Sequence, residues 1–468
     1  MTTYYVNPQT GSINNPGTMT KPWDTLANVF AKRKQLKSSD TLILMSGYHG
    51  ITTITGINTS PIKIIAGVGQ TPCLGALVFS KASNWTVSGL SISRTLIPLA
   101  HPDLALKQAG IAISTQTLED CSYITITNTR VYSGLDSSNW TAVEWKARKC
   151  FVYIYGTNIT LRNNHFFNGC GLQIGYHSNY CVVENNLMEN FSSDGVGNKG
   201  NFLTFANNIV RNLHKVDANH NDLFQSWGNT GTIIKNNLLV AWLPGNKFLD
   251  GVGVSDFQGL GFFDGSFVNQ QIANNEIYVD HPIGIWLMGG KGCTINNNFV
   301  RRCGKLTYFK TKLPSVSLLP SKSGSPSTNC TVTNNRAEVF NIQQTGGTAS
   351  SNIKITSTAK PQAGVGPVGT VGIIGVTPRS IESPDLTYQD IYKEEMLSPI
   401  DFKLSKAYQG VELVWNTLST VEGYIVNYKN NLVCKLFGSS NSIIIPELDD
   451  LQIENYSVIP YSNTKQSL

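Results

Sequence analysis

Short runs of β-forming residues alternate with polar turns along most of this chain, and many of the runs end in a pair of asparagines. Each copy has two or three residues such as Val, Ile, Thr or Phe, one variable residue, Asn-Asn and usually an apolar residue. The first asparagines of the pairs are Asn163, Asn185, Asn207, Asn236, Asn274, Asn297 and Asn334. The first two steps are 22 residues each, and the step after Asn274 is 23 residues. Such a repeat of short strands and tight turns predicts a solenoid.

The length of the repeat fits one coil of a parallel β-helix, with three short strands and three turns in about 22 residues. No unit has an apolar run long enough for the helices of a leucine-rich or tetratricopeptide array. Asparagine tolerates the left-handed backbone of a sharp turn, and asparagines stacked at a strand spacing of about 4.8 Å can form a ladder. The pattern therefore predicts an all-β chain, in which longer gaps are coils with an inserted loop.

Four parts are expected along the chain. Residues 1–39 form an N-terminal cap with a short amphipathic helix between Trp23 and Leu36, which Asp24 can cap. Residues 40–344 form the solenoid, and residues 345–395, where Gly, Ala, Val and Pro are frequent, form an extended linker. Residues 396–468 contain alternating strands at the spacing of a small β-sandwich.

The composition agrees with stacked rungs, because only 14% of the residues are charged and 42 are glycine. The net charge of +6 is modest for 468 residues and forms no concentrated basic stripe, so no nucleic-acid partner is expected. No segment is apolar enough to span a membrane, and the first residues lack the pattern of a signal peptide. Neither a membrane partner nor export by a signal peptide is therefore expected.

The nine cysteines do not indicate a disulfide framework. Cys181, Cys293 and Cys330 each lie four residues before the first asparagine of a pair. Equal phase in a solenoid means one stacked column, so these cysteines are expected to be small core residues. The odd count and the absence of paired spacing also argue against a zinc site.

Acidic residues gather at equivalent positions of two adjacent units. Asp194 and Asp222 lie 13 and 14 residues before the first asparagine of the following pair, so they should nearly stack on neighbouring rungs. Two carboxylates one rung apart match the separation of about 5 Å in a retaining glycosidase. A like-charged neighbour raises the pKa of one of them, which then serves as the acid. Asp217, as a partner at the larger inverting distance, and His220, which can tune the pair or bind a sugar acid, complete the predicted catalytic cluster.

Other side chains near this cluster suit a sugar polymer, because tryptophan offers a stacking face and lysine or arginine binds acidic groups. A Gly-rich stretch between residues 249 and 265 is expected to wall a groove. The predicted substrate-binding residues are Lys199, Arg211, Gln225, Trp227, Trp242, Lys247, Asp250, Asp264 and Trp286. Any single Asp beside Gly also suits a plain turn, but four titratable groups on two adjacent rungs favour function.

Two other functions stay open. A polysaccharide lyase needs a base beside C5 of a uronic acid and a group that neutralises its carboxylate. Lys199 and His220 fit this loosely, with a calcium ion on Asp194, Asp217 and Asp222 as the cofactor of that alternative. The glycosidase needs no cofactor or metal. A non-catalytic carbohydrate-binding spike or adhesin would have an aromatic groove without an acidic pair.

The front of the chain resembles the opening of the pectate-lyase-like superfamily of right-handed parallel β-helices. The residues that carry this resemblance are Tyr4-Tyr5-Val-Asn-Pro, Lys21-Pro22-Trp23-Asp-Thr-Leu and Asp40-Thr-Leu-Ile-Leu. The same opening occurs in polysaccharide lyases, glycoside hydrolases and bacteriophage tailspikes. The resemblance implies a right-handed coil and an activity on polysaccharides.

The end of the chain resembles a fibronectin type III module through Trp415, the Tyr-x-Val-x-Tyr strand that ends at Tyr428, and the late Tyr456. With this module and no signal peptide, the chain is most similar to phage tailspike depolymerases. That resemblance implies a homotrimer on the virion, attached to phage tail or baseplate proteins. It also implies a bacterial surface polysaccharide, capsule or O-antigen, as the substrate.

Overall fold

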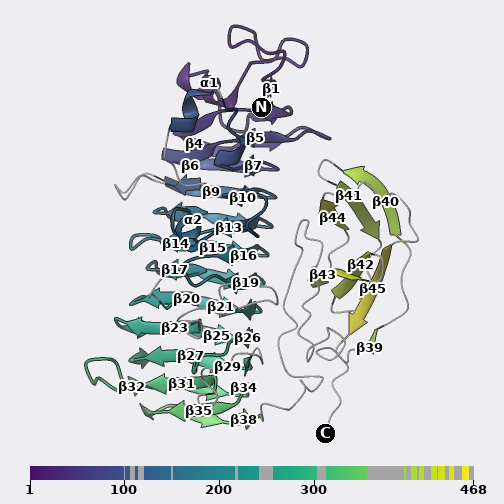
Figure 1. Cartoon of the computed structure of the whole chain (residues 1–468). Coiled ribbons are helices and arrows are strands. Elements are labelled where there is room, and N and C mark those ends of the chain that lie inside the picture. Colours follow the sequence, from purple (N-terminus) through teal and green to yellow (C-terminus); the bar gives the residue numbers. More distant parts are fainter. Residues whose placement is uncertain are drawn as a thin grey trace.

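The computed structural model of the protein (Figure 1) describes residues 1–99, 101–105, 111–113, 121–148, 151–216, 220–241, 257–302 and 313–355. It also describes seven strands between residues 395 and 462. The first part is a right-handed parallel β-helix, as predicted from the sequence. The second part consists of two small antiparallel sheets.

The coils build three walls, and strands pair in parallel with the equivalent strands of neighbouring coils. The first wall contains β11 (Val152–Ile154), β14 (Leu172–Ile174), β17 (Val196–Asn198), β20 (Asp222–Trp227), β23 (Gln258–Asp264), β27 (Ile283–Met288), β31 (Ser315–Leu319) and β35 (Val339–Ile342). The second wall contains β12 (Thr160–Arg162), β15 (Val182–Glu184), β18 (Thr204–Ala206), β21 (Ile233–Lys235), β25 (Gln271–Ala273), β29 (Thr294–Asn296), β33 (Thr331–Thr333) and β37 (Thr348–Ser350).

The third wall is a separate 12-stranded sheet. Its strands are β3 (Gly47–Tyr48), β5 (Pro72–Leu74), β7 (Ser91–Ile92), β10 (Arg130–Tyr132), β13 (His165–Gly169), β16 (Leu187–Phe191), β19 (Ile209–Leu213), β22 (Leu238–Val240), β26 (Glu276–Tyr278), β30 (Phe299–Arg301), β34 (Arg336–Ala337) and β38 (Ile353–Lys354). The coil thus continues beyond residue 344, where the solenoid was expected to end.

Further strands complete the coil. The first coils use β1 (Thr3–Val6), β2 (Thr41–Leu44), β4 (Ile51–Ala66), β6 (Ala76–Ser88), β8 (Ile111–Ile113) and β9 (Cys121–Thr127). A four-stranded sheet lies between the first and second walls of the later coils: β24 (Phe267–Val268), β28 (Gly290–Lys291), β32 (Ser327–Thr328) and β36 (Gln344–Thr345). The described residues also form four short helices: α1 (Leu26–Ala31), η1 (Arg94–Leu96), η2 (Pro102–Ala105) and α2 (Ala142–Lys146).

Alternate residues of the wall strands point into the coil and stack on their equivalents in the next coil. Leu172, Val196, Phe224 and Leu260 pair in register along the first wall, and none of them is exposed to solvent. Burying one large apolar side chain contributes about 1.5–3 kcal/mol. The solenoid is therefore stabilised by a sum of contacts between neighbouring coils.

The two asparagines of each repeated pair have different roles. The first adopts the left-handed conformation, with φ of 55° at Asn185 and 56° at Asn207. The second is buried, and the backbone N–H and side-chain amide of Asn186 donate to Oδ1 of Asn208, both at 3.0 Å. The resulting ladder consists of Asn164, Asn186, Asn208, Asn237, Asn275, Asn298 and Asn335, and ends at Asn352.

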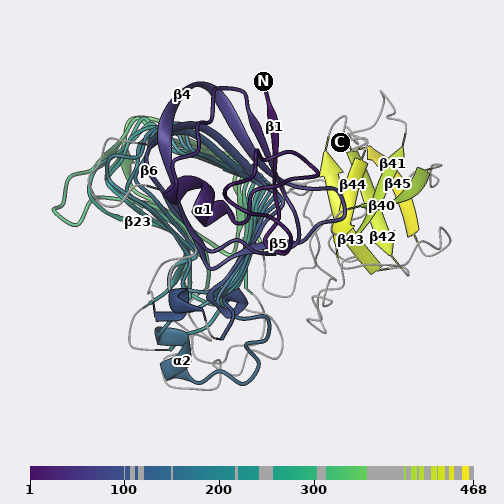
Figure 2. The same ribbon diagram turned by 90° about the horizontal axis from the view of Figure 1, so that it is seen from above.

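A short helix, α1 (Leu26–Ala31), lies across the end of the first coil (Figure 2). It is shorter than predicted, and its N-cap is Thr25 rather than Asp24, because the Thr25 hydroxyl accepts from the Asn28 N–H at 3.2 Å. The Asp24 carboxylate instead accepts from the Thr25 N–H and from the Asn28 side chain. The predicted cap also supplies β1, which pairs with β2 and so opens the long sheet.

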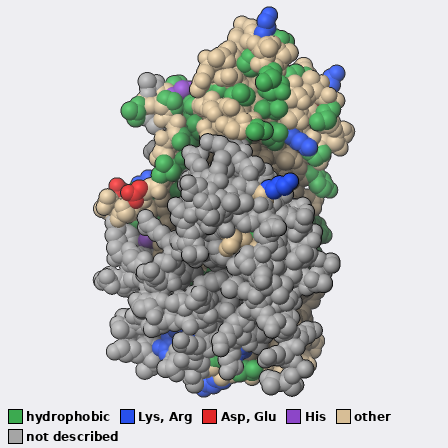
Figure 3. All heavy atoms as spheres, turned by 90° about the vertical axis from the view of Figure 1, so that its right-hand side faces the viewer, with side chains coloured by type: hydrophobic (Ala, Val, Ile, Leu, Met, Phe, Trp, Pro, Cys, Tyr) green, Lys and Arg blue, Asp and Glu red, His purple; other side chains and the backbone are tan. Residues whose placement is uncertain are grey.

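The expected core cysteines are confirmed: Cys181, Cys293 and Cys330 are buried and form no disulfide. No helix among the described residues is long and apolar enough to cross a membrane. On the face shown in Figure 3, the described Lys and Arg side chains are scattered and form no stripe.

The last part of the chain has a four-stranded antiparallel sheet and a three-stranded one, which agrees with the expected sandwich. The larger sheet contains β39 (Glu395–Met396), β42 (Gly423–Tyr428), β43 (Asn431–Phe437) and β45 (Tyr456–Ser462). The smaller sheet contains β40 (Phe402–Ala407), β41 (Gly410–Trp415) and β44 (Ser442–Pro446). Most of the expected linker, residues 345–395, lies outside the described residues.

Candidate functional site

The structure brings Asp194 and Asp222 together where the chain enters the first wall. Asp194 precedes β17 and Asp222 begins β20, and these strands are neighbours in register. The backbone N–H of Asp222 donates to Oδ1 of Asp194 at 3.0 Å. One carboxyl group thus lies one rung from the other, as the spacing of the sequence predicted.

Burial controls the ionisation of both carboxyl groups. Asp222 is fully buried, and neither of its carboxylate oxygens has a hydrogen-bond partner among the described residues. Burial, with the nearby charges of Asp194 and Asp264, holds the pKa of Asp222 well above its usual value. Burial also raises the pKa of Asp194 to about 6, although the Asp222 N–H and the nearby His220 act to lower it. Asp222 therefore holds its proton more tightly than an ordinary aspartate, while Asp194 is mostly ionised at neutral pH.

A glycine on the next rung makes room for the Asp222 carboxyl group. A Cβ atom on Gly261 of β23 would lie 2.7 Å from Oδ1 of Asp222 and 2.4 Å from the ring of Phe263. Asp264 ends the same strand as a third carboxylate, and it forms an ion pair with Lys322. The three acidic side chains thus lie at successive rungs of the first wall.

The outward residues of the first wall form a polar and aromatic face. Gln173, Gly197, Gln225, Gly261 and Trp286 pair in register along it. The side chain of Gln173 lies over Gly197, with Oε1 2.3 Å from where a Cβ would stand. Next to Gly261, the rings of Trp286 and Phe263 pack edge to face, with their centres 6.4 Å apart. Two residues predicted to bind substrate, Gln225 and Trp286, therefore share the wall of the acidic pair.

Lys199 marks the other edge of this wall. Its Nζ lies 4.9 Å from the ring centre of Tyr176 and 4.9 Å from that of Trp227. The two aromatic faces attract the ammonium group and fix its position. Tyr176 is 59% exposed, so the fixed charge lies beside an open aromatic surface. This arrangement suits the carboxylate of an acidic sugar, and Tyr176 was not identified from the sequence.

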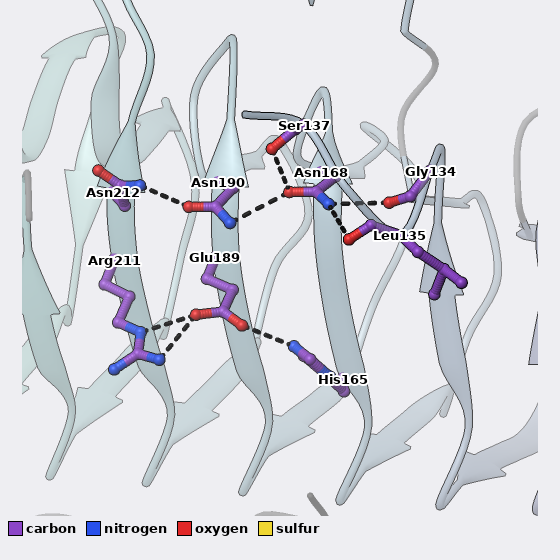
Figure 4. Close-up of polar contacts among 9 residues, drawn as sticks. All are labelled: Gly134, Leu135, Ser137, His165, Asn168, Glu189, Asn190, Arg211 and Asn212. Carbon is purple, nitrogen blue, oxygen red and sulfur yellow. Dashed lines mark hydrogen bonds and ion pairs between the residues drawn. The ribbon is translucent and has the colours of Figure 1, made fainter. Parts of the chain in front are cut away.

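Arg211, also predicted to bind substrate, lies instead on the third wall in a buried ion-pair cluster (Figure 4). Its Nε and Nη2 donate to Oε2 of Glu189 at 2.9 and 2.7 Å, and Nε2 of His165 lies 2.9 Å from Oε1. Burial alone would raise the pKa of Glu189, but Arg211 and His165 outweigh it and bring that pKa to about 2. Burial lowers the pKa of His165 despite its contact with Glu189. A carboxylate held ionised in this way is no acid catalyst, and the Arg211 guanidinium is engaged with it inside the cluster.

The remaining predicted residues are placed as follows. His220 is exposed beside Asp194, and Asp264 is half-buried. Asp217, Trp242, Lys247 and Asp250 lie outside the described residues. No group of three His, Cys, Asp or Glu side chains in the described part of the chain could hold a metal ion.

No protein-family model matches the chain, and no curated protein is significantly similar to it in sequence. Among solved structures, the pectate lyase Pel9A is similar over 76% of this chain and 82% of its own, at 16% identity and a TM-score of 0.47. A GH136 lacto-N-biosidase from Eubacterium ramulus is similar over 75% and 67%, at 15% identity and a TM-score of 0.48. The Dettilon tailspike protein is similar over 93% and 89%, at 14% identity and a TM-score of 0.44. At these values the likenesses assign no activity to this chain.

Proposed function

We propose that this protein is a polysaccharide depolymerase that hydrolyses glycosidic bonds in a bacterial capsule or O-antigen. The observation that carries the proposal is the pair of Asp194 and Asp222. Two carboxyl groups with raised pKa values lie one rung apart, on a wall whose outward side chains are polar and aromatic. Such a pairing of a neutral acid with an ionised neighbour is the requirement of a glycosidase.

In this mechanism Asp222 is the general acid, because burial and the nearby carboxylates hold its pKa well above the usual value. Asp194 is the nucleophile, since a spacing of about one rung matches the separation of about 5 Å in retaining enzymes. The leaving oxygen approaches over Gly261, which has no side chain, and the ring of Phe263 has to turn aside to admit it. Asp222 then protonates the leaving oxygen while Asp194 attacks the anomeric carbon.

A lyase is the second candidate, and the position of Lys199 favours it. Its Nζ is held at 4.9 Å from two aromatic rings at the edge of the same wall. There it can neutralise a uronate carboxylate and so acidify the proton on C5. In this reaction a base removes the C5 proton and the bond to the leaving oxygen breaks, which leaves a double bond in the sugar. A calcium ion would be a cofactor only in this second case.

We further propose that the protein acts as a homotrimeric phage tailspike, attached to tail or baseplate proteins and working at the surface of the host. The support is the resemblance of the N-terminal residues to β-helix depolymerases and of the last strands to a fibronectin type III module. Light scattering of the purified full chain tests the trimer: a mass of one chain, 51.1 kDa, would contradict it.

Mass spectrometry of fragments from a panel of capsular and O-antigen polysaccharides tests the reaction. Fragments with one added water indicate hydrolysis, whereas fragments with an unsaturated end indicate the lyase. A polysaccharide that binds and stays intact indicates a non-catalytic spike. Asp194→Asn and Asp222→Asn should each lower hydrolysis by at least about 100-fold. Glu184→Gln, which removes a carboxylate paired with Arg162 on the second wall, is the matched control and should keep full activity.

A further inference from the structure

In ten successive coils, the turn that leads to the second wall holds one left-handed residue. These residues are Asn84, Tyr123, Asn158, Tyr180, Phe202, Gly231, Asn269, Gly292, Asn329 and Gly346. Parallel bridges join Ser122 to Thr157, Thr157 to Asn179, and Asn179 to Asn201, so the residues that follow them lie on successive rungs. Asn and Gly are the residues that tolerate this conformation. Three of the ten positions nevertheless carry aromatic side chains.

These aromatic side chains are both strained and exposed. Tyr123, Tyr180 and Phe202 have φ of 53°, 55° and 54°. A bulky residue in this region costs on the order of 1–2 kcal/mol. Their exposed fractions are 57%, 55% and 41%, so burial in the core does not offset that cost. A role in the stability of the coil therefore does not explain them.

Two of the rings form a stack with one open side. The rings of Tyr180 and Phe202 lie 4.8 Å apart and 6° from parallel. Phe202 in turn lies over Gly231, where a Cβ would be 2.6 Å from its ring. Phe202 thus backs one face of Tyr180, and the other face of Tyr180 is turned toward the rung of Asn158.

Asn158 forms the floor of a slot between Tyr180 and Tyr123. The two tyrosines lie two rungs apart, which is about 9–10 Å at the usual strand spacing. A ring in van der Waals contact on both faces needs about 7–8 Å, and a puckered sugar ring needs somewhat more. Asn158 is half-buried, and its side-chain amide makes no hydrogen bond with any described residue. The slot therefore combines two aromatic walls with an unused amide that can both donate and accept.

We propose that Tyr123, Asn158 and Tyr180 bind one pyranose ring of a polysaccharide, away from the acidic pair. The apolar faces of the sugar stack on the two tyrosines, and adjacent hydroxyl groups bond to the Asn158 amide. This site rests on the proposed function for its choice of ligand. It holds the same polymer, because the turn begins directly after the first wall: Lys199 is three residues before Phe202, and Tyr176 is four residues before Tyr180.

Filling the slot tests the proposal most sharply. Asn158→Tyr adds a ring at a position whose neighbours already carry tyrosine at the same φ, so the coil should still form. Tyr123→Asn and Tyr180→Asn insert the residue that other rungs use there, and they should leave the thermal midpoint unchanged or raised. Leu135→Asn removes an exposed apolar side chain outside this turn and is the matched control.

Binding is measured by affinity electrophoresis of the full chain in gels that contain each capsular or O-antigen polysaccharide of the panel. The Asp194→Asn background prevents cleavage during the run. All three slot variants should be retained at least about tenfold more weakly than the control. Retention equal to that of the control would overturn the site, as would failure of every polysaccharide to retain the parent chain. Weakened retention without any cleavage by the wild type would instead keep the site and reject the depolymerase.

Discussion

Asp194→Asn should stabilise the folded protein at neutral pH and leave its stability unchanged near pH 4. Burial raises the pKa of Asp194 from 3.8 to about 6 in the folded state. A raised pKa means that the folded protein holds the proton more tightly than the unfolded chain does. Stability is therefore fully present below about pH 4 and decreases as the pH rises toward 6. Asparagine has nearly the same shape as aspartate and no charge, so the variant should not lose stability as the pH rises.

The size of the effect follows from the difference between the two pKa values. Two pKa units correspond to about 3 kcal/mol, and because Asp194 is partly exposed, screening by solvent reduces this to about 1–3 kcal/mol. The variant keeps an oxygen that can accept from the Asp222 N–H, so the local hydrogen bond survives. The gain should appear gradually between pH 4 and 6 and remain constant above pH 7.

Guanidinium unfolding of the wild type and the variant, followed by circular dichroism at several pH values from 4 to 8, measures the gain. Glu184→Gln removes an exposed ion pair with Arg162, so it should change stability by less than about 1 kcal/mol. An equal shift of the Asp194→Asn midpoint at pH 4 and pH 8 would refute the reasoning, because packing and not ionisation would then be its cause. The wild-type hydrolysis rate should rise through pH 6 as Asp194 ionises, and the variant should lack both the activity and that rise.

Three further outcomes follow from other parts of the coil. Asn208→Ala removes the oxygen that accepts from the backbone N–H and the side-chain amide of Asn186. The amide keeps two carbonyl acceptors, but the buried N–H loses this one, which should lower the free energy of unfolding by about 1–3 kcal/mol in denaturant titrations. Glu189→Gln breaks a buried ion pair and should lower the free energy of unfolding by about 3–5 kcal/mol at pH 7. The folded pKa of Glu189 is depressed to about 2, so this difference from the wild type should shrink as the pH falls from about 4 to 2 in the same titrations. Lys199→Met should leave the thermal midpoint unchanged, and in affinity gels it should weaken retention by uronate-containing polysaccharides but not by neutral ones. Equal weakening for both kinds of polysaccharide would show that the charge of Lys199 does not take part in binding.

Much of the coil was predictable because every rung repeats the same geometry. An asparagine pair at a fixed phase marks the same turn in each rung, so the repeat alone indicates stacked strands and a ladder. The pair does not reveal which asparagine bends the backbone and which one enters the core. In the structure Asn185 takes the left-handed turn, and Asn186 joins the ladder. The helix cap was harder to predict, since Asp24 and Thr25 are both good caps and only the local backbone chooses between them.

The candidate site was predictable only where the spacing of residues along the chain determines which rung they occupy. The offsets of Asp194 and Asp222 place them on adjacent rungs, and the structure brings them together. Arg211 was assigned from its charge alone, although Glu189 and Arg211 both lie four residues after the first asparagine of a pair, which points to the ion pair. The burial of Asp222 could not be predicted from this spacing, because it depends on the absence of a side chain at Gly261, which lies 39 residues later on the next rung.

The buried ladder of asparagines has a direction. From Asn164 to Asn335, each amide donates to the oxygen of the asparagine in the coil that comes later in the chain. The aligned dipoles reinforce one another along the axis. During synthesis, no coil can complete its polar core until the next coil has left the ribosome. Growth of the rod is therefore vectorial, and a chain cut between Asn298 and Asn335 would present the amide of Asn298 at its newest rung without one of its three acceptors, Oδ1 of Asn335.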